Sequence, residues 1–301
     1  MTVIVSSSTI ASLINCPRRF ILNYHRTERT PSLATEVGTA VHQALQDATE
    51  AGDRHAATKA LIKRYPYELW LTATNKERAS RSLLSCAVAI DTALDTLDLH
   101  GMRLAEVNGR KATELDFLLT LTDKDDKPLD IAYSGSIDSV FVDSTGMPII
   151  TDYKTTTKDI NLAVLQYSHS LQACIYAIVV ASALGIEPTD IEYQYIIIKL
   201  DNGMGEVHTE RARVTPAKLN EVRGYLKVYT TVLQQMLAER NFPPNSSSCT
   251  SFGRPCYFAN QCDMAHINEA ITSALTTSPA YRYAYLETGK TDYDIRGRLS
   301  L

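Results

Sequence analysis

The chain has 301 residues, of which 45% are hydrophobic and 21% are charged. These proportions are those of a folded globular protein and exclude a chain that is disordered throughout, and the length suits one elaborated domain or one domain with an appendage. The formal net charge is −4, whereas many nucleic-acid binders have an excess of basic residues. Contacts with phosphates would therefore depend on local clusters of basic side chains, such as Arg18, Arg19, Arg26 and Arg29.

The first hundred residues are predicted to be mainly helical. Ser6 to Ser8 can cap a helix that continues to about Tyr24 and includes Cys16. Apolar residues at steps of three and four between Val37 and Ala48 predict a second helix, and helical periodicity returns from Lys76 to Leu99. His42 lies beside the apolar face of the second helix, where a histidine taken alone is more often packed in the core than bound to a metal.

The centre of the chain is predicted to form a sheet and then to return to helices. Short, alternating segments rich in strand-forming residues occur at 103–107, 112–121, 131–142 and 149–153, with DKDDK and DSTGMP as turns. The later elements are a helix at 162–184, a strand at 191–199, a turn at Asn202-Gly203, a strand near 207–214 and a helix at 216–240. These predicted helices and strands give the expected fold class, α/β (α+β).

The segment GSIDSVFVDSTGMPIITDYKTT contains the residues best suited to chemistry. Asp152 and Lys154 are two apart on a strand and share one face, while Tyr153 points to the other, and the preceding turn brings Asp138 alongside. Carboxylates hold Mg²⁺ or Mn²⁺, which activates water and neutralises charge on a phosphate, and a lysine can stabilise the transition state. Taken alone, an Asp-x-Lys pair is more often an exposed strand face with a surface salt bridge.

Several motifs follow one another in an order that resembles a known family. They are CPRRF after a serine-rich start, GTAVHQAL, ELDFLLTL, GSIDSVFV, DYKTT, LQACIYAI with its Q-x-x-x-Y pattern, and a final cysteine segment. Together, from Ser6 to Cys262, they resemble the RecB-like branch of the PD-(D/E)XK nucleases, which includes AddB nuclease domains and CRISPR-associated and phage exonucleases. The resemblance implies a restriction-endonuclease-like core with a central mixed β-sheet flanked by helices.

The resemblance also implies roles for individual residues. The implied Mg²⁺ or Mn²⁺ ligands are His42, Asp138, Asp152 and the carbonyl of Tyr153, and Lys154 is catalytic. Gln172 and Tyr176, four apart on one helix face, are expected to contact the active site or the DNA backbone. Glu114 lies where some relatives carry an acidic residue, and it is a weaker candidate because a glutamate on a solvated strand face would look the same.

Four of the six cysteines are candidate ligands of a second metal site. Cys249, Cys256 and Cys262 share one short segment, and with Cys16 they resemble the four-cysteine [4Fe–4S] site of some RecB-like nucleases, although Cys249 and Cys256 lie further apart than is usual there. Zinc suits the same thiolates and is the alternative, and ordinary buried or loop cysteines are the third reading. Cys86 and Cys174 occupy core-like helix positions and are expected to be structural.

Four segments are expected along the chain. They are a helical part with Cys16 and His42 at 1–100, a nuclease core at 101–240, a cysteine-rich clasp that packs on the N-terminal helix at 241–276, and a tail at 277–301. Within the tail, AYLETGKT at Ala284 to Thr291 fits a loose phosphate-binding loop, but only ten residues follow it. A nucleotide-binding domain needs more chain than this, so we expect a polar turn.

The expected function is a metal-dependent DNA nuclease, an exonuclease on DNA ends or single strands in repair, recombination or phage DNA metabolism. A helicase or recombination protein is a candidate partner. Two alternatives remain open: a DNA-binding or assembly subunit of a helicase or recombination complex, and a nuclease of CRISPR spacer acquisition. The sequence has no apolar run near the roughly 20 residues that span a bilayer and no basic leader, so we expect no membrane partner and a cytoplasmic location, in the host if a phage encodes the chain.

Overall fold

The computed structural model describes residues 3–25, 31–99, 101–168, 170–201, 204–251, 254–276 and 293–301. The chain divides into two compact units. Unit 1 comprises Met1–Arg29, Phe117–Gly135 and Asn220–Leu301, and unit 2 comprises Thr30–Asp116 and Ser136–Leu219. Strands β5 (Thr113–Thr122) and β6 (Pro128–Val142) and helix α10 (Pro216–Ala238) each contribute residues to both units. The units therefore alternate along the chain, whereas the expected segments follow one another.

The sheet of unit 2 is mixed. The second half of β6 pairs antiparallel with β7 (Pro148–Thr156) and with β2 (Arg103–Leu104). Strand β7 pairs parallel with β8 (Glu192–Asp201), which pairs antiparallel with β9 (Met204–Arg213). A small separate hairpin joins β3 (Glu106–Val107) and β4 (Arg110–Lys111). The prediction of a mixed sheet is confirmed.

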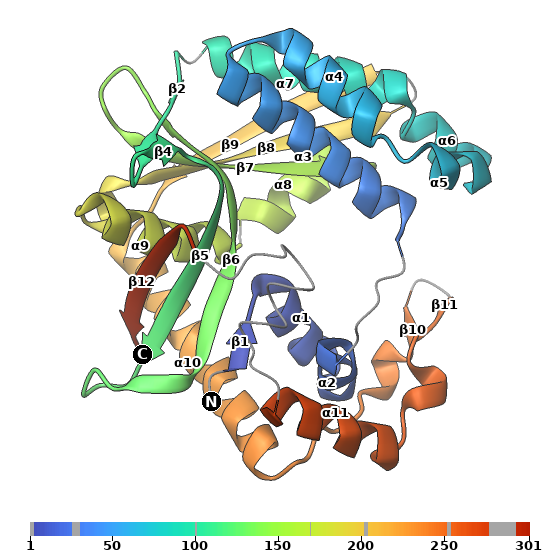
Figure 1. Ribbon diagram of the computed structural model, residues 1–301, viewed down its shortest axis with the longest axis vertical. Helices are drawn as coiled ribbons and strands as arrows, with labels where there is room; N and C mark the ends of the chain where they lie inside the picture. Colours follow the sequence, from blue (N-terminus) through green and yellow to red (C-terminus); the bar gives the residue numbers. More distant parts are fainter. Residues whose placement is uncertain are drawn as a thin grey trace. The chain divides into compact units, whose positions relative to one another are not determined.

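Helices cover both faces of this sheet (Figure 1). One face packs against α3 (Leu33–Ala51) and α7 (Leu83–Leu99), and α4 (Arg54–Arg64) packs on these two helices. The other face packs against α8 (Ile160–Ser168) and α9 (Gln172–Leu184). The short helices α5 (Tyr67–Thr72) and α6 (Asn75–Ser80) join α4 to α7, and η1 (Pro188–Asp190) precedes β8. Strand residues Tyr153, Ile196 and Ile198 alternate onto the α3 and α7 side and are buried there.

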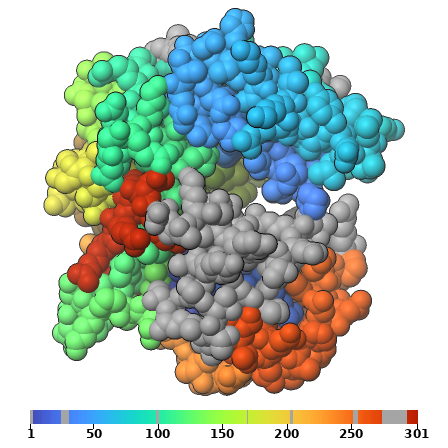
Figure 2. Space-filling model, viewed as in Figure 1, coloured from blue at the N-terminus to red at the C-terminus, as the bar shows by residue number. Residues whose placement is uncertain are grey.

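Unit 1 contains strands at its beginning and its end that the sequence did not predict. Strand β1 (Val3–Val5) pairs parallel with residues 131–133 of β6, and β12 (Ile295–Ser300) pairs parallel with residues 117–122 of β5. The expected tail thus contains a strand, which lies at the surface in Figure 2. Arg26, Arg29, the turn at Asn202-Gly203 and the AYLETGKT segment lie outside the described residues.

The helices of unit 1 include a pair that was predicted as one. Helix α1 (Ser7–Asn15) ends at Cys16, whose backbone is extended, and α2 (Pro17–His25) begins directly after it. Proline at the first helical position needs no N–H partner, whereas the residue before it is biased towards extended backbone. The prediction that Cys16 lies within a helix is therefore wrong, because Cys16 lies at the break between two helices.

The cysteine segment of unit 1 follows α10. It contains η2 (Ser246–Ser248), the hairpin of β10 (Thr250–Ser251) and β11 (Arg254–Pro255), and η3 (Ala259–Gln261). Helix α11 (Met264–Thr276) then packs against α2.

In the part of the chain that the structure describes, no single helix is long and apolar enough to cross a bilayer. Helices α8 and α9 meet the same length and composition test only when they are combined, and the pair is bent by 52°.

Candidate active site

Strand β7 places the Asp-x-Lys pair on one face of the unit 2 sheet. The Lys154 Nζ atom lies 2.5 Å from Asp152 Oδ2, and the Asp152 side chain is 5% exposed. Between them, Tyr153 points the other way into the core and is 1% exposed. The predicted alternation is confirmed, and the low exposure of Asp152 removes the alternative of a solvated surface pair.

Asp138 is attached to the same strand by its side chain. The last backbone pairs between β6 and β7 reach Ser139 and Thr151. Beyond them, the backbone N–H of Tyr153 donates a 2.8 Å hydrogen bond to Asp138 Oδ2. The carboxylate of Asp138 thus takes the place of a backbone acceptor and is held next to the Asp-x-Lys pair.

Helix α3 brings His42 to this carboxylate. The His42 Nδ1 atom lies 3.4 Å from Asp138 Oδ2, and the ring meets the Tyr153 ring edge-on with centroids 6.0 Å apart. One turn earlier, a Cβ atom on Gly38 would lie 3.2 Å from Thr155 Oγ1. The glycine of GTAVHQAL therefore allows α3 to approach β7 closely. This close approach places His42 next to Asp138.

Glu114 completes a group that could bind a metal. Its carboxylate accepts a 3.1 Å hydrogen bond from Ser136 Oγ, and one ligand atom each from His42, Glu114 and Asp138 lies within 4.8 Å of the others. The backbone of Glu114 has a φ of 43°, a left-handed conformation that is costly for a residue other than glycine and is concentrated at functional sites. From the sequence this residue was a weaker candidate, and the structure places it with His42 and Asp138.

The membership of this group differs from the expected ligand set. Among the residues that the structure describes, the group of ligand atoms includes Glu114 and omits Asp152, whose carboxylate contacts Lys154 instead. The chemistry of the group fits a hard divalent cation, because carboxylate oxygens suit Mg²⁺ and Mn²⁺ and an imidazole nitrogen is a common further ligand.

The candidate site holds three carboxylates, those of Glu114, Asp138 and Asp152, in a region with little contact with water. Burial raises the pKa of Asp152 to about 6, against the attraction of Lys154, and burial together with Asp138 raises the pKa of Glu114 to about 7. Burial alone would raise the pKa of Asp138 and lower that of His42. Their mutual attraction outweighs burial, so the pKa of Asp138 is lowered and that of His42 is raised. A bound cation would relieve the repulsion among these carboxylates.

A comparison with protein families gives the superfamily of the chain. A family model described as the PD-(D/E)XK nuclease superfamily matches residues 4–263. The chain belongs to this superfamily. No curated protein sequence matches it significantly. Strand β6 carries Asp138, and strand β7 carries Asp152-Tyr153-Lys154, a sequence with the acid-x-lysine pattern in the name of the superfamily.

Two solved structures are similar to this PD-(D/E)XK chain. The protein SSO0001 is 13% identical, with a TM-score of 0.31, and the match covers 72% of this chain and 84% of that one. A candidate exonuclease from Eubacterium rectale is also 13% identical, with a TM-score of 0.44, and the match covers 85% of this chain and 91% of that one. Both similarities are too weak to add to the family assignment.

An aromatic pair beside Lys154 was not predicted from the sequence. The Lys154 Nζ atom lies over the ring of Tyr167 on α8, 5.9 Å from its centroid. Tyr167 stacks on Tyr195 of β8, with centroids 5.5 Å apart. Burial alone would lower the pKa of Lys154, but the charge of Asp152 outweighs it and raises that pKa. No motif marks Tyr167, because its partners come from separate strands.

Gln172 and Tyr176 lie one turn apart on α9, as predicted. The Gln172 side-chain amide donates a hydrogen bond to the Tyr176 hydroxyl. Helix α9 packs on β7 and β8, the strands that carry Lys154 and Tyr195. The predicted helix at 162–184 is in fact two helices, and the second begins at Gln172.

The candidate cluster cysteines are joined by backbone contacts within unit 1. The Asn245 N–H donates to Cys16 Sγ at 3.4 Å, the Cys249 thiol contacts the Asn245 carbonyl at 3.8 Å, and the Cys256 N–H donates to the Cys249 carbonyl at 2.7 Å. Within the described ranges, no three cysteine sulfurs lie within 4.8 Å of one another. Cys86 and Cys174 are fully buried.

Arg18 contacts the cysteine segment, although the sequence had suggested a phosphate contact. Its guanidinium donates to the carbonyls of Phe242 at 3.2 Å and Cys262 at 3.4 Å, and it lies 4.0 Å from Cys262 Sγ. Arg18, the first of the two arginines in CPRRF, therefore joins α2 to the cysteine segment at Phe242 and at Cys262.

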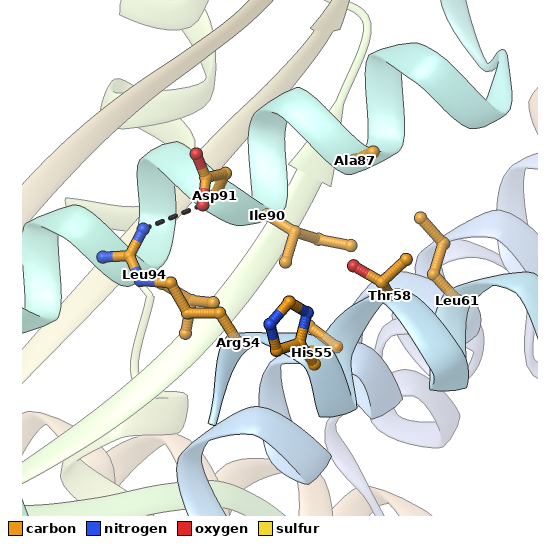
Figure 3. A pocket seen from close by; sticks show the side chains of 9 residues that line it. Arg54, His55, Thr58, Leu61, Ala87, Ile90, Asp91 and Leu94 are labelled. Atoms are coloured by element: carbon orange, nitrogen blue, oxygen red, sulfur yellow. Dashed lines mark hydrogen bonds and ion pairs between the residues drawn. The ribbon is translucent and has the colours of Figure 1, made fainter. Parts of the chain in front are cut away.

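A small cavity of about 120 Å³ lies between α4 and α7, away from these residues. Figure 3 shows Arg54, His55 and Thr58 of α4 facing Ile90 and Asp91 of α7. Arg54 bridges Asp91 at 2.8 Å and Asp95 at 2.6 Å and so joins the two helices at the rim. None of the candidate metal ligands lines this cavity.

Proposed function

We propose that this nuclease-superfamily chain is a metal-dependent deoxyribonuclease of the RecB-like branch that acts as an exonuclease. The observation that carries the proposal is the convergence of His42, Glu114 and Asp138 within 4.8 Å, next to the buried pair of Asp152 and Lys154. Acidic ligands beside a lysine suit phosphodiester hydrolysis, because the phosphate develops negative charge as the bond breaks.

In this proposal, His42, Glu114 and Asp138 would hold Mg²⁺ or Mn²⁺, with Asp152 and the Tyr153 carbonyl as further ligands. The bound ion would supply an activated water and would neutralise charge on the phosphate. Lys154 holds its ammonium at the scissile phosphate, and the hydrogen bond from the Tyr153 N–H keeps Asp138 oriented. Gln172 and Tyr176 are proposed to contact the DNA backbone.

DNA ends or single strands are the proposed substrate, and DNA repair, recombination or phage DNA metabolism in the cytoplasm is the proposed setting. A helicase or recombination protein is the proposed partner. The superfamily assignment supports a nuclease in general. The resemblance of the ordered motifs to RecB-like nucleases supports the proposed substrate, setting and partner.

End-labelled linear DNA and covalently closed circular DNA test the activity directly. We expect the purified protein to degrade linear DNA in Mg²⁺ or Mn²⁺ and to lose all activity in EDTA, because the proposed mechanism needs the metal. Closed circles should resist cleavage. Cleavage that persists in EDTA would exclude the metal mechanism, and rapid nicking of circles would replace the exonuclease by an endonuclease.

We also propose that Cys16, Cys249, Cys256 and Cys262 hold a [4Fe–4S] cluster, with zinc as the alternative. The contacts through Asn245 and Arg18 support a common site, because they bring the cysteine segment to the α1–α2 break. The resemblance of the cysteine segment to that of some RecB-like nucleases is what favours the cluster over zinc.

The cluster predicts a shared effect of its four ligands. Protein prepared without oxygen should contain about four irons per chain. Cys16→Ser should lose most of this iron and become sensitive to protease, because the link closes a loop of more than two hundred residues. Cys86→Ala, at a buried cysteine outside the site, should keep its iron. Full iron content in Cys16→Ser would exclude Cys16 as a ligand.

A further inference from the structure

The ammonium of Lys154 has two neighbours of different character. One is the Asp152 carboxylate, at 2.5 Å, and the other is the face of the Tyr167 ring, at 5.9 Å from its centroid. The lysine side chain is 22% exposed. An ammonium over an aromatic ring is attracted by the electron-rich face, and the attraction is stronger where water is largely excluded.

The Tyr167 ring is held in place by the sheet. It stacks on Tyr195 at an interplanar angle of 30°, and Tyr195 meets the edge of Tyr193 with centroids 5.9 Å apart. Tyr195 is 1% exposed and lies directly opposite Asp152 in the register of β7 and β8. Tyr167 comes from α8, so its ring joins this helix to the strand pair that carries the catalytic residues.

These two neighbours act differently once the site is in use. A carboxylate that gives an oxygen to a divalent cation has less negative charge to offer the lysine. The ring of Tyr167 carries no charge and ligates no metal, so its attraction for the ammonium does not depend on the state of Asp152. An unconstrained lysine would otherwise lose order, because its four-carbon chain has many rotamers.

We propose that Tyr167 is a positioning residue for Lys154: its ring, held by Tyr195, keeps the ammonium in the site independently of Asp152. This inference deepens the proposed nuclease function and rests on it for its kinetic consequence. It concerns the ring and not the hydroxyl group, and this distinction makes it testable by substitution.

Two variants separate the ring from its hydroxyl. Tyr167→Phe keeps the aromatic face, whereas Tyr167→Leu removes it and keeps an apolar side chain. Tyr225→Leu is the matched control, because Tyr225 is also half-buried and pairs with one tyrosine ring, Tyr229 at 4.7 Å, on α10. Circular dichroism and urea unfolding of all three variants identify any general loss of structure.

The first measurement needs neither DNA nor metal. The full-length protein carries Asp152→Asn, so that the other neighbour of the ammonium has no charge. An amine-reactive reagent is applied, and mass spectrometry gives the labelling rate of Lys154 relative to the exposed Lys158. Adding Tyr167→Leu to this background should raise the ratio by about 5- to 30-fold, as expected for the loss of a partly desolvated cation–π contact. Adding Tyr167→Phe or Tyr225→Leu should leave the ratio within about twofold of the Asp152→Asn protein.

The second measurement is the cleavage of end-labelled DNA in Mn²⁺. Tyr167→Leu should lower kcat by about 5- to 30-fold with little change in KM or in Mn²⁺ affinity, and Tyr167→Phe should restore kcat. A labelling ratio that Tyr167→Leu leaves unchanged in the Asp152→Asn background would overturn the proposal. Equal losses in the Phe and Leu variants would also overturn it, because the hydroxyl would then be responsible.

The two measurements fail separately. If the unaltered protein does not cleave DNA under any metal, the nuclease proposal is wrong, while the labelling ratio still decides whether Tyr167 holds Lys154. If the unaltered protein cleaves DNA and the labelling ratio does not respond to Tyr167→Leu, the nuclease proposal stands and the positioning role is wrong.

Discussion

Replacing Lys154 by alanine should lower the rate of DNA cleavage by roughly 10²- to 10³-fold, the usual cost of losing one group that stabilises charge in a transition state. The binding of Mn²⁺ should persist, because the ligand atoms of His42, Glu114 and Asp138 converge without the lysine. Calorimetric titration of Mn²⁺ and cleavage of end-labelled DNA measure the two effects on the same protein.

Asp138→Ala provides the contrast for this experiment. It removes a proposed ligand, the acceptor of the Tyr153 N–H and the partner of His42, so Mn²⁺ affinity and cleavage should both fall. Lys158→Ala, four residues beyond Lys154 at an exposed position, is the control for the loss of a positive charge. Loss of Mn²⁺ binding in Lys154→Ala, or cleavage at the original rate, would contradict the assigned role.

Replacing Gly205 by alanine should destabilise the protein by about 1–3 kcal/mol, because it forces an extra group into a filled space. A Cβ atom at Gly205 would lie 2.5 Å from Ala89 Cα and 2.7 Å from Ala89 N. These are backbone atoms of α7, so the helix and β9 would have to separate. Urea unfolding followed by circular dichroism measures the change in free energy of unfolding.

Gly224→Ala is the matched control, with the opposite expected sign. Gly224 lies in α10, and a Cβ atom there would meet nothing within 4 Å. Alanine in an open helix position should stabilise the protein by about 0.5–1 kcal/mol. If the two substitutions changed stability in the same direction, the close packing of β9 on α7 would not be the cause of the Gly205 effect.

The local patterns of the sequence predicted most of unit 2. The side chains of Asp152, Tyr153 and Lys154 alternate as the twofold period of a strand requires, and the apolar face of α3 follows the helical period. Both periods depend on neighbouring residues alone, which is why a single sequence reveals them. The mixed order of the strands followed from the family resemblance rather than from these periods.

The parts that were missed depend on distant partners or on backbone conformation. Strand β12 has the sequence IRGRLS, in which two arginines and a glycine hide the strand pattern, and it pairs with residues 117–122. The positive φ of Glu114 and the ring of Tyr167 beside Lys154 have no local signal either. By contrast, the helix break at Cys16 could have been predicted from Pro17, because proline disfavours helical backbone in the residue before it.

Strand β12 also determines how the sheet of unit 1 meets solvent. Uncovered strands offer free backbone donors and acceptors to other chains and promote aggregation, and charged side chains on an edge oppose this. By pairing along residues 117–122, β12 covers the hydrogen-bonding side of a long apolar strand and replaces it with an edge that carries Arg296 and Arg298. A shortened version that ends at residue 276 would lack β12 and would leave the backbone groups of β5 uncovered, which favours aggregation. A purification tag should therefore be added after Leu301 and should not replace β12.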